Sequence, residues 1–165
     1  MTPRLVLIGA PAAGKTRLGK RIARLMELPF LDTDKMVVAK HGPIPEIFAE
    51  HGEPQFRQWE REAVIEALSS SGVVAFGGGA ILNEDTQNDL KGLTVVLVSI
   101  TPEEAEKRIQ DSSRPLLAGG LDAWRALVDK RQPIYDRVST FEVDTSRRPL
   151  DHIAEEVVAQ LQESA

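Results

Sequence analysis

The sequence predicts an α/β domain built around a parallel β-sheet. Short apolar runs of strand length alternate with longer segments in which apolar residues recur at helical spacing. The first run, Arg4–Ile8, is almost uninterrupted, which is typical of a parallel strand buried on both faces. Such alternation favours one sheet with helices packed on it. The chain has 165 residues, so we expect a single domain over residues 1–165.

The order of the elements can be read along the chain. The first helix is expected over Lys15–Met26, where apolar residues recur on one face, and Pro149 opens the last helix, a position that proline favours. Residues 110–120 fit neither pattern and end in two glycines, so we expect a mobile lid there. Further helices are expected over residues 44–70 with a break near 52–54, after residue 102 and over 121–137, and strands over residues 4–8, 30–31, 73–76, 94–100 and 140–143.

Composition limits the classes of function. Hydrophobic residues make up 42% of the chain, enough to bury a core. There is no cysteine, which excludes disulfides and cysteine-based metal sites or nucleophiles and favours a reducing compartment, the cytoplasm. The net charge of −5 argues against a nucleic-acid partner, and no apolar run of membrane-spanning length is present. A chain of this size can fold alone, so we expect a monomer.

The segment GAPAAGKT, Gly9–Thr16, matches the pattern G-x-x-x-x-G-K-[ST] at every constrained position. It lies between an expected strand and an expected helix, as a phosphate-binding P-loop does. Glycines let backbone N–H groups converge on an anion, and the helix N-terminus adds a favourable dipole. The motif therefore predicts a nucleoside triphosphate. We expect ATP contacts from Ala12, Ala13, Gly14, Lys15 and Thr16 within it, and from Arg17 directly after it.

Two aspartates end the second expected strand in the segment Asp32-Thr-Asp34. In extended backbone these side chains share one face, at the end of the sheet where α/β proteins bind ligands. One carboxylate would then serve a magnesium ion together with Thr16, and the other would act on a substrate hydroxyl as a base. The alternative is that the first aspartate caps a helix and the second is a solvated acid.

Three further features are candidates for the rest of the site. Arg57 and Glu60 have the i, i+3 spacing of a helical ion pair, which would orient the guanidinium to bind a carboxylate; an exposed salt bridge is the alternative. Gly77, Gly78 and Gly79 follow the third strand, where backbone approaches a ligand closely or simply turns. Arg114 in the expected lid would reach the transferring phosphoryl group on closure.

Together these segments resemble the shikimate kinases. The match runs from GAPAAGKT through DTD, IFAEHGEPQFRQWE, FGGGA, RPLL and RQPIY to DTSRRP, most of the chain. The resemblance implies a P-loop fold like that of the nucleoside monophosphate kinases: a five-stranded parallel sheet flanked by helices, a substrate-binding subdomain at about residues 32–62 and a lid at about 110–120. It also implies that ATP and Mg2+ are used to phosphorylate the 3-hydroxyl of shikimate, on the route to chorismate and the aromatic amino acids.

The resemblance also assigns roles by position. It implies that Asp34 meets the ring hydroxyls of shikimate and that Arg57, oriented by Glu60, and Arg131 meet its carboxylate. The remaining roles are carried over as sets: Lys15, Asp34 and Arg114 for catalysis, Thr16 and Asp32 for magnesium, Gly77, Gly78 and Gly79 beside shikimate, and Arg108, Arg114 and Arg148 around ATP.

Two other interpretations remain open at this point. A gluconate kinase shares the P-loop and phosphorylates another polyhydroxy carboxylate, but its family does not combine DTD with FRxxE. A non-catalytic nucleotide-binding module or a switch would also carry a P-loop. A switch needs a residue that positions water, and the sequence offers no clear candidate.

Overall fold

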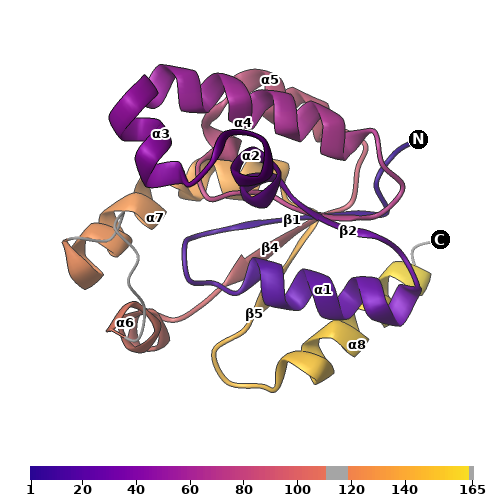
Figure 1. Ribbon diagram of the computed structural model, residues 1–165. Coiled ribbons are helices and arrows are strands. Elements are labelled where there is room, and N and C mark those ends of the chain that lie inside the picture. Colours follow the sequence, from indigo (N-terminus) through magenta and orange to yellow (C-terminus); the bar gives the residue numbers. More distant parts are fainter. Residues whose placement is uncertain (111–118, 164–165) are drawn as a thin grey trace.

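Five parallel strands form the centre of the molecule in a computed structural model, which describes residues 1–110 and 119–163 (Figure 1). Their order is β2-β3-β1-β4-β5, so β1 is central and the chain crosses it between β3 and β4. Leu7 of β1 lies opposite Ala75 of β3 and Val96 of β4. The strands are β1 Leu5–Gly9, β2 Phe30–Asp32, β3 Val73–Ala75, β4 Val95–Ser99 and β5 Phe141–Asp144.

Helices cover both faces of the sheet (Figure 1). Helices α1 (Lys15–Met26) and α8 (Leu150–Glu163) lie side by side on one face, and α4 (Glu53–Leu68) lies on the other. The remaining elements are α2 Thr33–His41, α3 Ile44–His51, the 3-10 helix η1 Ala80–Leu82, α5 Glu84–Asp89, α6 Pro102–Gln110 and α7 Gly120–Val138.

Alternation along β1 divides the core into two layers. Leu5 and Leu7 pack with α1 and α8, whereas Val6 and Ile8 pack with α4, and all four side chains are buried. Burying each such side chain contributes about 1.5–3 kcal/mol, so the strand is anchored from both sides. The loop that follows β1 therefore begins from a fixed point.

A third, smaller core holds α2, α3 and α4 together. It contains Val37, Ile47, Phe56 and Ala63, which are buried against one another. Phe56 also contacts Phe48, with the ring centroids 5.0 Å apart. This packing fixes the rotation of α4 about its axis, and therefore the directions in which Arg57 and Glu60 project.

The fold expected from the sequence is confirmed, but two helices were missing from the expected order of elements. Helix α5 was not anticipated, and helix α2 was anticipated only in the alternative in which Asp32 caps a helix. In α2 the apolar residues Met36, Val37 and Val38 follow one another instead of recurring at helical spacing, and α5 has six residues, all polar. The expected lid falls largely on residues 111–118, which lie outside the described residues. Across residues 1–110 and 119–163, none of the helices has the length and apolar character to cross a membrane.

Candidate active site

The P-loop, Gly9–Thr16, connects the central strand β1 to helix α1. Gly9 and Gly14 have φ angles of 151° and 91°, and a Cβ at Gly9 would lie 2.2 Å from the carbonyl oxygen of Val98. Both positions therefore require glycine. Helix α1 has no acidic residue in its first turn, so the positive end of its dipole is available to an anion.

Lys15 lies at the start of α1 and folds back over the loop. Its Nζ donates to the carbonyl oxygens of Gly9 at 2.7 Å and Ala10 at 3.0 Å. These contacts hold the ammonium group beside the cradle, where phosphate oxygens of a bound nucleotide would lie.

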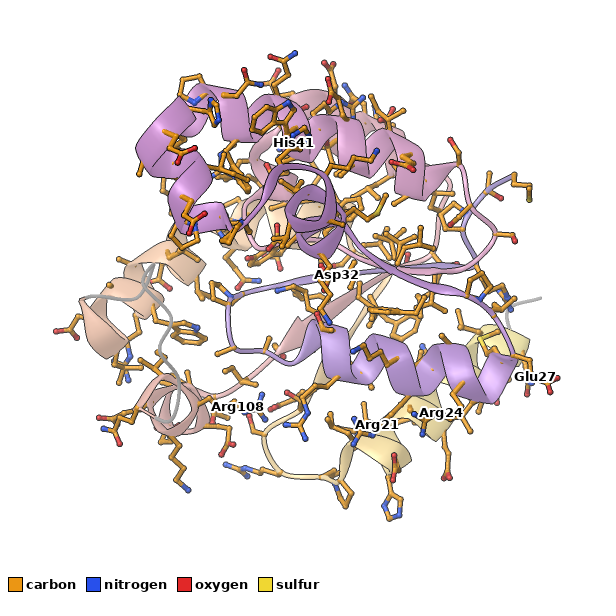
Figure 2. The ribbon with its side chains drawn as sticks, in the orientation of Figure 1. Arg21, Arg24, Glu27, Asp32, His41 and Arg108 are labelled. Carbon is orange, nitrogen blue, oxygen red and sulfur yellow. The ribbon has the colours of Figure 1, made fainter. Side chains whose placement is uncertain are left out.

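Thr16 and Asp32 join the N-terminal ends of two helices. The Thr16 hydroxyl donates to Asp32 Oδ2 at 2.6 Å, and Asp32 Oδ1 accepts from the backbone N–H of Lys35 at 3.1 Å as the N-cap of α2. Asp32 and Arg108 approach the N-terminal end of α1 from different sides (Figure 2). A hydroxyl and a carboxylate in contact are the hard oxygen donors that Mg2+ prefers, so this pair fits the expected ion.

The explanation that placed Asp34 beside Asp32 was wrong. Asp34 belongs to the first turn of α2 and not to extended backbone, so the two side chains do not share a strand face. The capping alternative is correct for Asp32, although the same carboxylate also contacts Thr16. Asp34 instead reaches Gly77 from the helix.

Three charged side chains converge on the glycines that follow β3. A Cβ at Gly77 would lie 2.0 Å from Asp34 Oδ1, and one at Gly79 would lie 2.2 Å from Arg57 Nη1. A side chain at either position would force the Asp34 carboxylate or the Arg57 guanidinium to move. Arg131 donates from Nη1 to the carbonyl oxygen of Gly78 at 2.7 Å.

The glycine segment also lies beside the P-loop. A Cβ at Gly78 would be 3.6 Å from both Arg131 Nη1 and the Pro11 ring, which is ordinary contact. Asp34, Arg57 and Arg131 come from α2, α4 and α7, and the glycine segment brings all three together next to the phosphate cradle.

Arg57 is held by the acid expected from its helical spacing. Its Nη1 donates to both carboxylate oxygens of Glu60, at 3.0 and 3.1 Å, and Glu53 adds a contact at 3.4 Å to Nη2. The Glu60 side chain is 4% exposed whereas that of Arg57 is 34% exposed. The interpretation as an exposed salt bridge is therefore wrong, because the Glu60 carboxylate is buried and the Arg57 side chain is partly buried.

Burial alters the acidity of both carboxyl groups. Burial raises the pKa of Asp34, and the negative charge of Asp32 raises it further, whereas Lys15 and Arg57 oppose the shift. Burial likewise raises the pKa of Glu60, against the effect of Arg57. Asp34 is thus a better proton acceptor than an ordinary surface aspartate.

The remaining predicted ATP residues are placed unequally. Arg108 contacts the P-loop directly, since its Nη1 donates to the carbonyl oxygen of Ala12 at 2.9 Å. The side chain of Arg17 is exposed. The side chain of Arg148 is also exposed, and it forms an ion pair with Glu156 of α8 instead of a contact with the P-loop. Arg114 lies outside the described residues.

Comparison with known proteins identifies the family. A model of the shikimate kinase family matches residues 11–162. The chain belongs to the shikimate kinase family. It is 42% identical to a shikimate kinase of Rhodococcus jostii (strain RHA1), over 99% of this chain and 100% of that protein. It is 45% identical to one of Thermobifida fusca (strain YX), over 96% of this chain and 95% of that protein.

Similarity to a solved structure agrees with the family membership. The fold matches that of the shikimate kinase from Acinetobacter baumannii in complex with shikimate, with a TM-score of 0.89 and 30% sequence identity. The match covers 99% of this chain and 94% of that one. The resemblance seen in the sequence motifs is therefore confirmed, as are the class of enzyme and the P-loop kinase fold.

Sequence reasoning missed three side chains that support the site. Thr33 accepts from the backbone N–H of Gly77 at 2.8 Å and fixes the glycine segment from α2. Trp124 Nε1 donates to the Pro11 carbonyl oxygen at 3.0 Å, and Thr145 Oγ1 donates to that of Ala13 at 2.8 Å. Thr33 and Thr145 lie within DTD and DTSRRP, so the motifs indicated the region, but nothing in the sequence indicated Trp124.

Proposed function

We propose that this protein transfers the γ-phosphoryl group of ATP to the 3-hydroxyl of shikimate, giving shikimate 3-phosphate and ADP. One observation carries the proposal: an acid and two guanidinium groups meet at the glycine segment 77–79, beside a P-loop. Shikimate has one carboxylate and several hydroxyls, and this set of groups complements it. Family membership supports the same reaction.

Arg57 and Arg131 bind the shikimate carboxylate in this proposal. A guanidinium can donate two parallel hydrogen bonds to a carboxylate, which fixes the orientation of the ring. Glu60 holds Arg57 through one nitrogen, Nη1. Its buried charge thereby preorganises the guanidinium before substrate arrives.

Asp34 receives the hydroxyl that attacks the phosphoryl group. Its raised pKa suits a group that accepts a hydrogen bond and then a proton. Phosphoryl transfer has a loose transition state that demands little of a base, so alignment of the hydroxyl is the larger contribution. Lys15 faces the β- and γ-phosphates and stabilises the charge that develops on them.

Thr16 and Asp32 would hold Mg2+, directly or through its waters. The ion, when bound, neutralises charge on the β- and γ-phosphate oxygens. Ala12, Ala13 and Gly14 supply the surrounding backbone. Arg108 and Arg148 flank the adenine, and Arg114 is the further arginine that we assign to ATP. We place this reaction in the cytoplasm and in a monomer, at the shikimate step of aromatic amino acid biosynthesis.

A coupled assay of ADP release tests the proposal. Purified protein is supplied with MgATP and, in separate reactions, with shikimate, gluconate or a nucleoside monophosphate. We expect turnover with shikimate alone. Turnover with gluconate in place of shikimate would support the gluconate kinase alternative, and nucleotide binding without turnover on any acceptor would support a non-catalytic module.

A further inference from the structure

Every backbone carbonyl from Gly9 to Ala13 accepts a hydrogen bond from a side chain. Lys15 serves the first two, and the next three are served from segments far along the chain. The distant pairs are Trp124 Nε1 with Pro11 at 3.0 Å, Arg108 Nη1 with Ala12 at 2.9 Å and Thr145 Oγ1 with Ala13 at 2.8 Å. The P-loop is thus fastened from outside by α6, α7 and the segment after β5.

The fastened loop contains a strained residue. Ala12 has a φ angle of 70°, in the left-handed region, where an L-residue with a Cβ costs about 1–2 kcal/mol. Strain of this kind persists only when the surroundings fix the conformation. The carbonyl groups on either side of the Ala12 nitrogen and Cα, those of Pro11 and Ala12, are the ones held by Trp124 and Arg108.

The packing around Trp124 holds its indole N–H in a fixed position. Its side chain is buried, and the residue is 4% exposed within the core of the α1 and α8 face. It lies two turns before Arg131 on α7, so one helix contacts Pro11 through an indole and Gly78 through a guanidinium. A rigid, packed donor at Pro11 allows the loop little freedom.

We propose that Trp124, assisted by Thr145, is a positioning residue for nucleotide binding. Its indole N–H holds the Pro11 carbonyl and thereby keeps Ala12 in the left-handed conformation in which the loop N–H groups face the phosphates. The proposal rests on the proposed function, because it takes the P-loop ligand to be a nucleotide. Neither residue touches the reacting atoms.

The test is calorimetric titration of MgADP and, separately, of shikimate into the wild type and Trp124→Phe. Phenylalanine keeps an aromatic ring and removes the donor. We expect the Kd for MgADP to rise roughly 3- to 10-fold, the size of one lost hydrogen bond, with a much smaller change in the Kd for shikimate. The other tryptophan, Trp59, gives a matched control because it packs against the small core of α2, α3 and α4. Trp59→Phe should leave the Kd for MgADP unchanged.

A second background tests the strain directly. Glycine adopts the left-handed conformation at no steric cost, so Trp124→Phe should weaken MgADP binding less in an Ala12→Gly protein than in the wild type. Should Trp124→Phe fail to fold, Thr145→Val, which removes the donor to Ala13 while keeping the side-chain shape, carries the same expectation.

The outcomes separate the two proposals. The positioning role is overturned if the Trp124→Phe or Thr145→Val protein binds MgADP as tightly as the wild type does. It is also overturned if Trp124→Phe weakens MgADP binding equally in the wild-type and Ala12→Gly backgrounds. An equal loss of affinity for MgADP and for shikimate overturns it as well. A wild type that binds no MgADP overturns the proposed function as well.

Discussion

The hydroxyl of Thr16 donates a 2.6 Å hydrogen bond to one carboxylate oxygen of Asp32, and the other oxygen caps helix α2. One side chain therefore links the phosphate cradle to the first helix of the substrate side. It has a structural role at one oxygen and a candidate metal role at the other. A substitution that separates these roles is possible because asparagine caps helices as well as aspartate does.

We expect Asp32→Asn to keep the fold but lose magnesium affinity. The amide oxygen can still cap α2, while the negative charge near the ion disappears. The concentration of Mg2+ needed for half-maximal turnover should rise roughly 10- to 100-fold, with little change in Tm. Magnesium titrations at fixed ATP measure this, and an unchanged magnesium requirement would remove Asp32 from the metal site.

We expect Gly79→Ala to impair the use of shikimate severely. A Cβ there would lie 2.2 Å from Arg57 Nη1, so the guanidinium must move. The loss in kcat/KM for shikimate should be roughly 10- to 100-fold, because small misplacements of a binding group are costly. Gly78→Ala is the matched control, with its nearest neighbours at 3.6 Å, and should cost distinctly less. Equal losses in the two variants would contradict the close approach of Arg57.

Arg57→Ala should weaken shikimate binding strongly and leave ATP binding nearly intact. It also leaves the buried Glu60 carboxylate without its partner, which should lower the free energy of unfolding by about 1–3 kcal/mol. Adding Glu60→Gln should restore part of this stability without restoring shikimate binding. Urea unfolding and calorimetry measure the two effects, and equal losses of ATP and shikimate binding would refute the division of the site.

Asp34→Asn should stabilise the protein while impairing turnover. The pKa of Asp34 is raised in the folded state, so its ionised form costs stability at neutral pH. This cost is absent below the unfolded pKa of the group, where both states hold the proton, and appears fully once pH exceeds the folded pKa. The gain in Tm for Asp34→Asn should therefore be present at pH 8 and vanish toward pH 3. A gain independent of pH would mean that desolvation of the charge is not its origin.

The far end of α1 offers a stability gain that leaves the site untouched. Glu27 caps α1 with a φ angle of 55° and lies at the opposite end of the helix from the P-loop (Figure 2). Glu27→Gly should raise the free energy of unfolding by about 0.5–1 kcal/mol, because glycine adopts this conformation freely. Glu27→Ala retains the Cβ and should show no such gain by urea denaturation. Kinetic constants should not change in either variant.

The sequence predicted the nucleotide side of the site more completely than the acceptor side. The P-loop is local, since its glycines, Lys15 and Thr16 lie within eight residues and the motif fixes their geometry. The meeting of Arg131 with Gly78 joins residues that are 53 positions apart and depends on how α7 packs. Spacing correctly paired Arg57 with Glu60, but it could not reveal that Glu60 would be buried.

The position of Asp34 could not be predicted from local spacing. Alternation in a strand placed it near Asp32, whereas helix α2 begins between them and turns Asp34 toward Gly77. Trp124 was beyond reach for a related reason, because its contact with Pro11 spans 113 positions and follows no motif. Tertiary packing decides both outcomes, and periodicity does not report it.

The separate core of Val37, Ile47, Phe56 and Ala63 has a consequence for how such a chain can diversify. Two of the residues proposed to bind the acceptor, Asp34 and Arg57, lie on helices α2 and α4, which share this small core, whereas Arg131 lies on α7. Substitutions in that core should therefore shift Asp34 and Arg57 before they disturb the P-loop, which is anchored to β1 and α1.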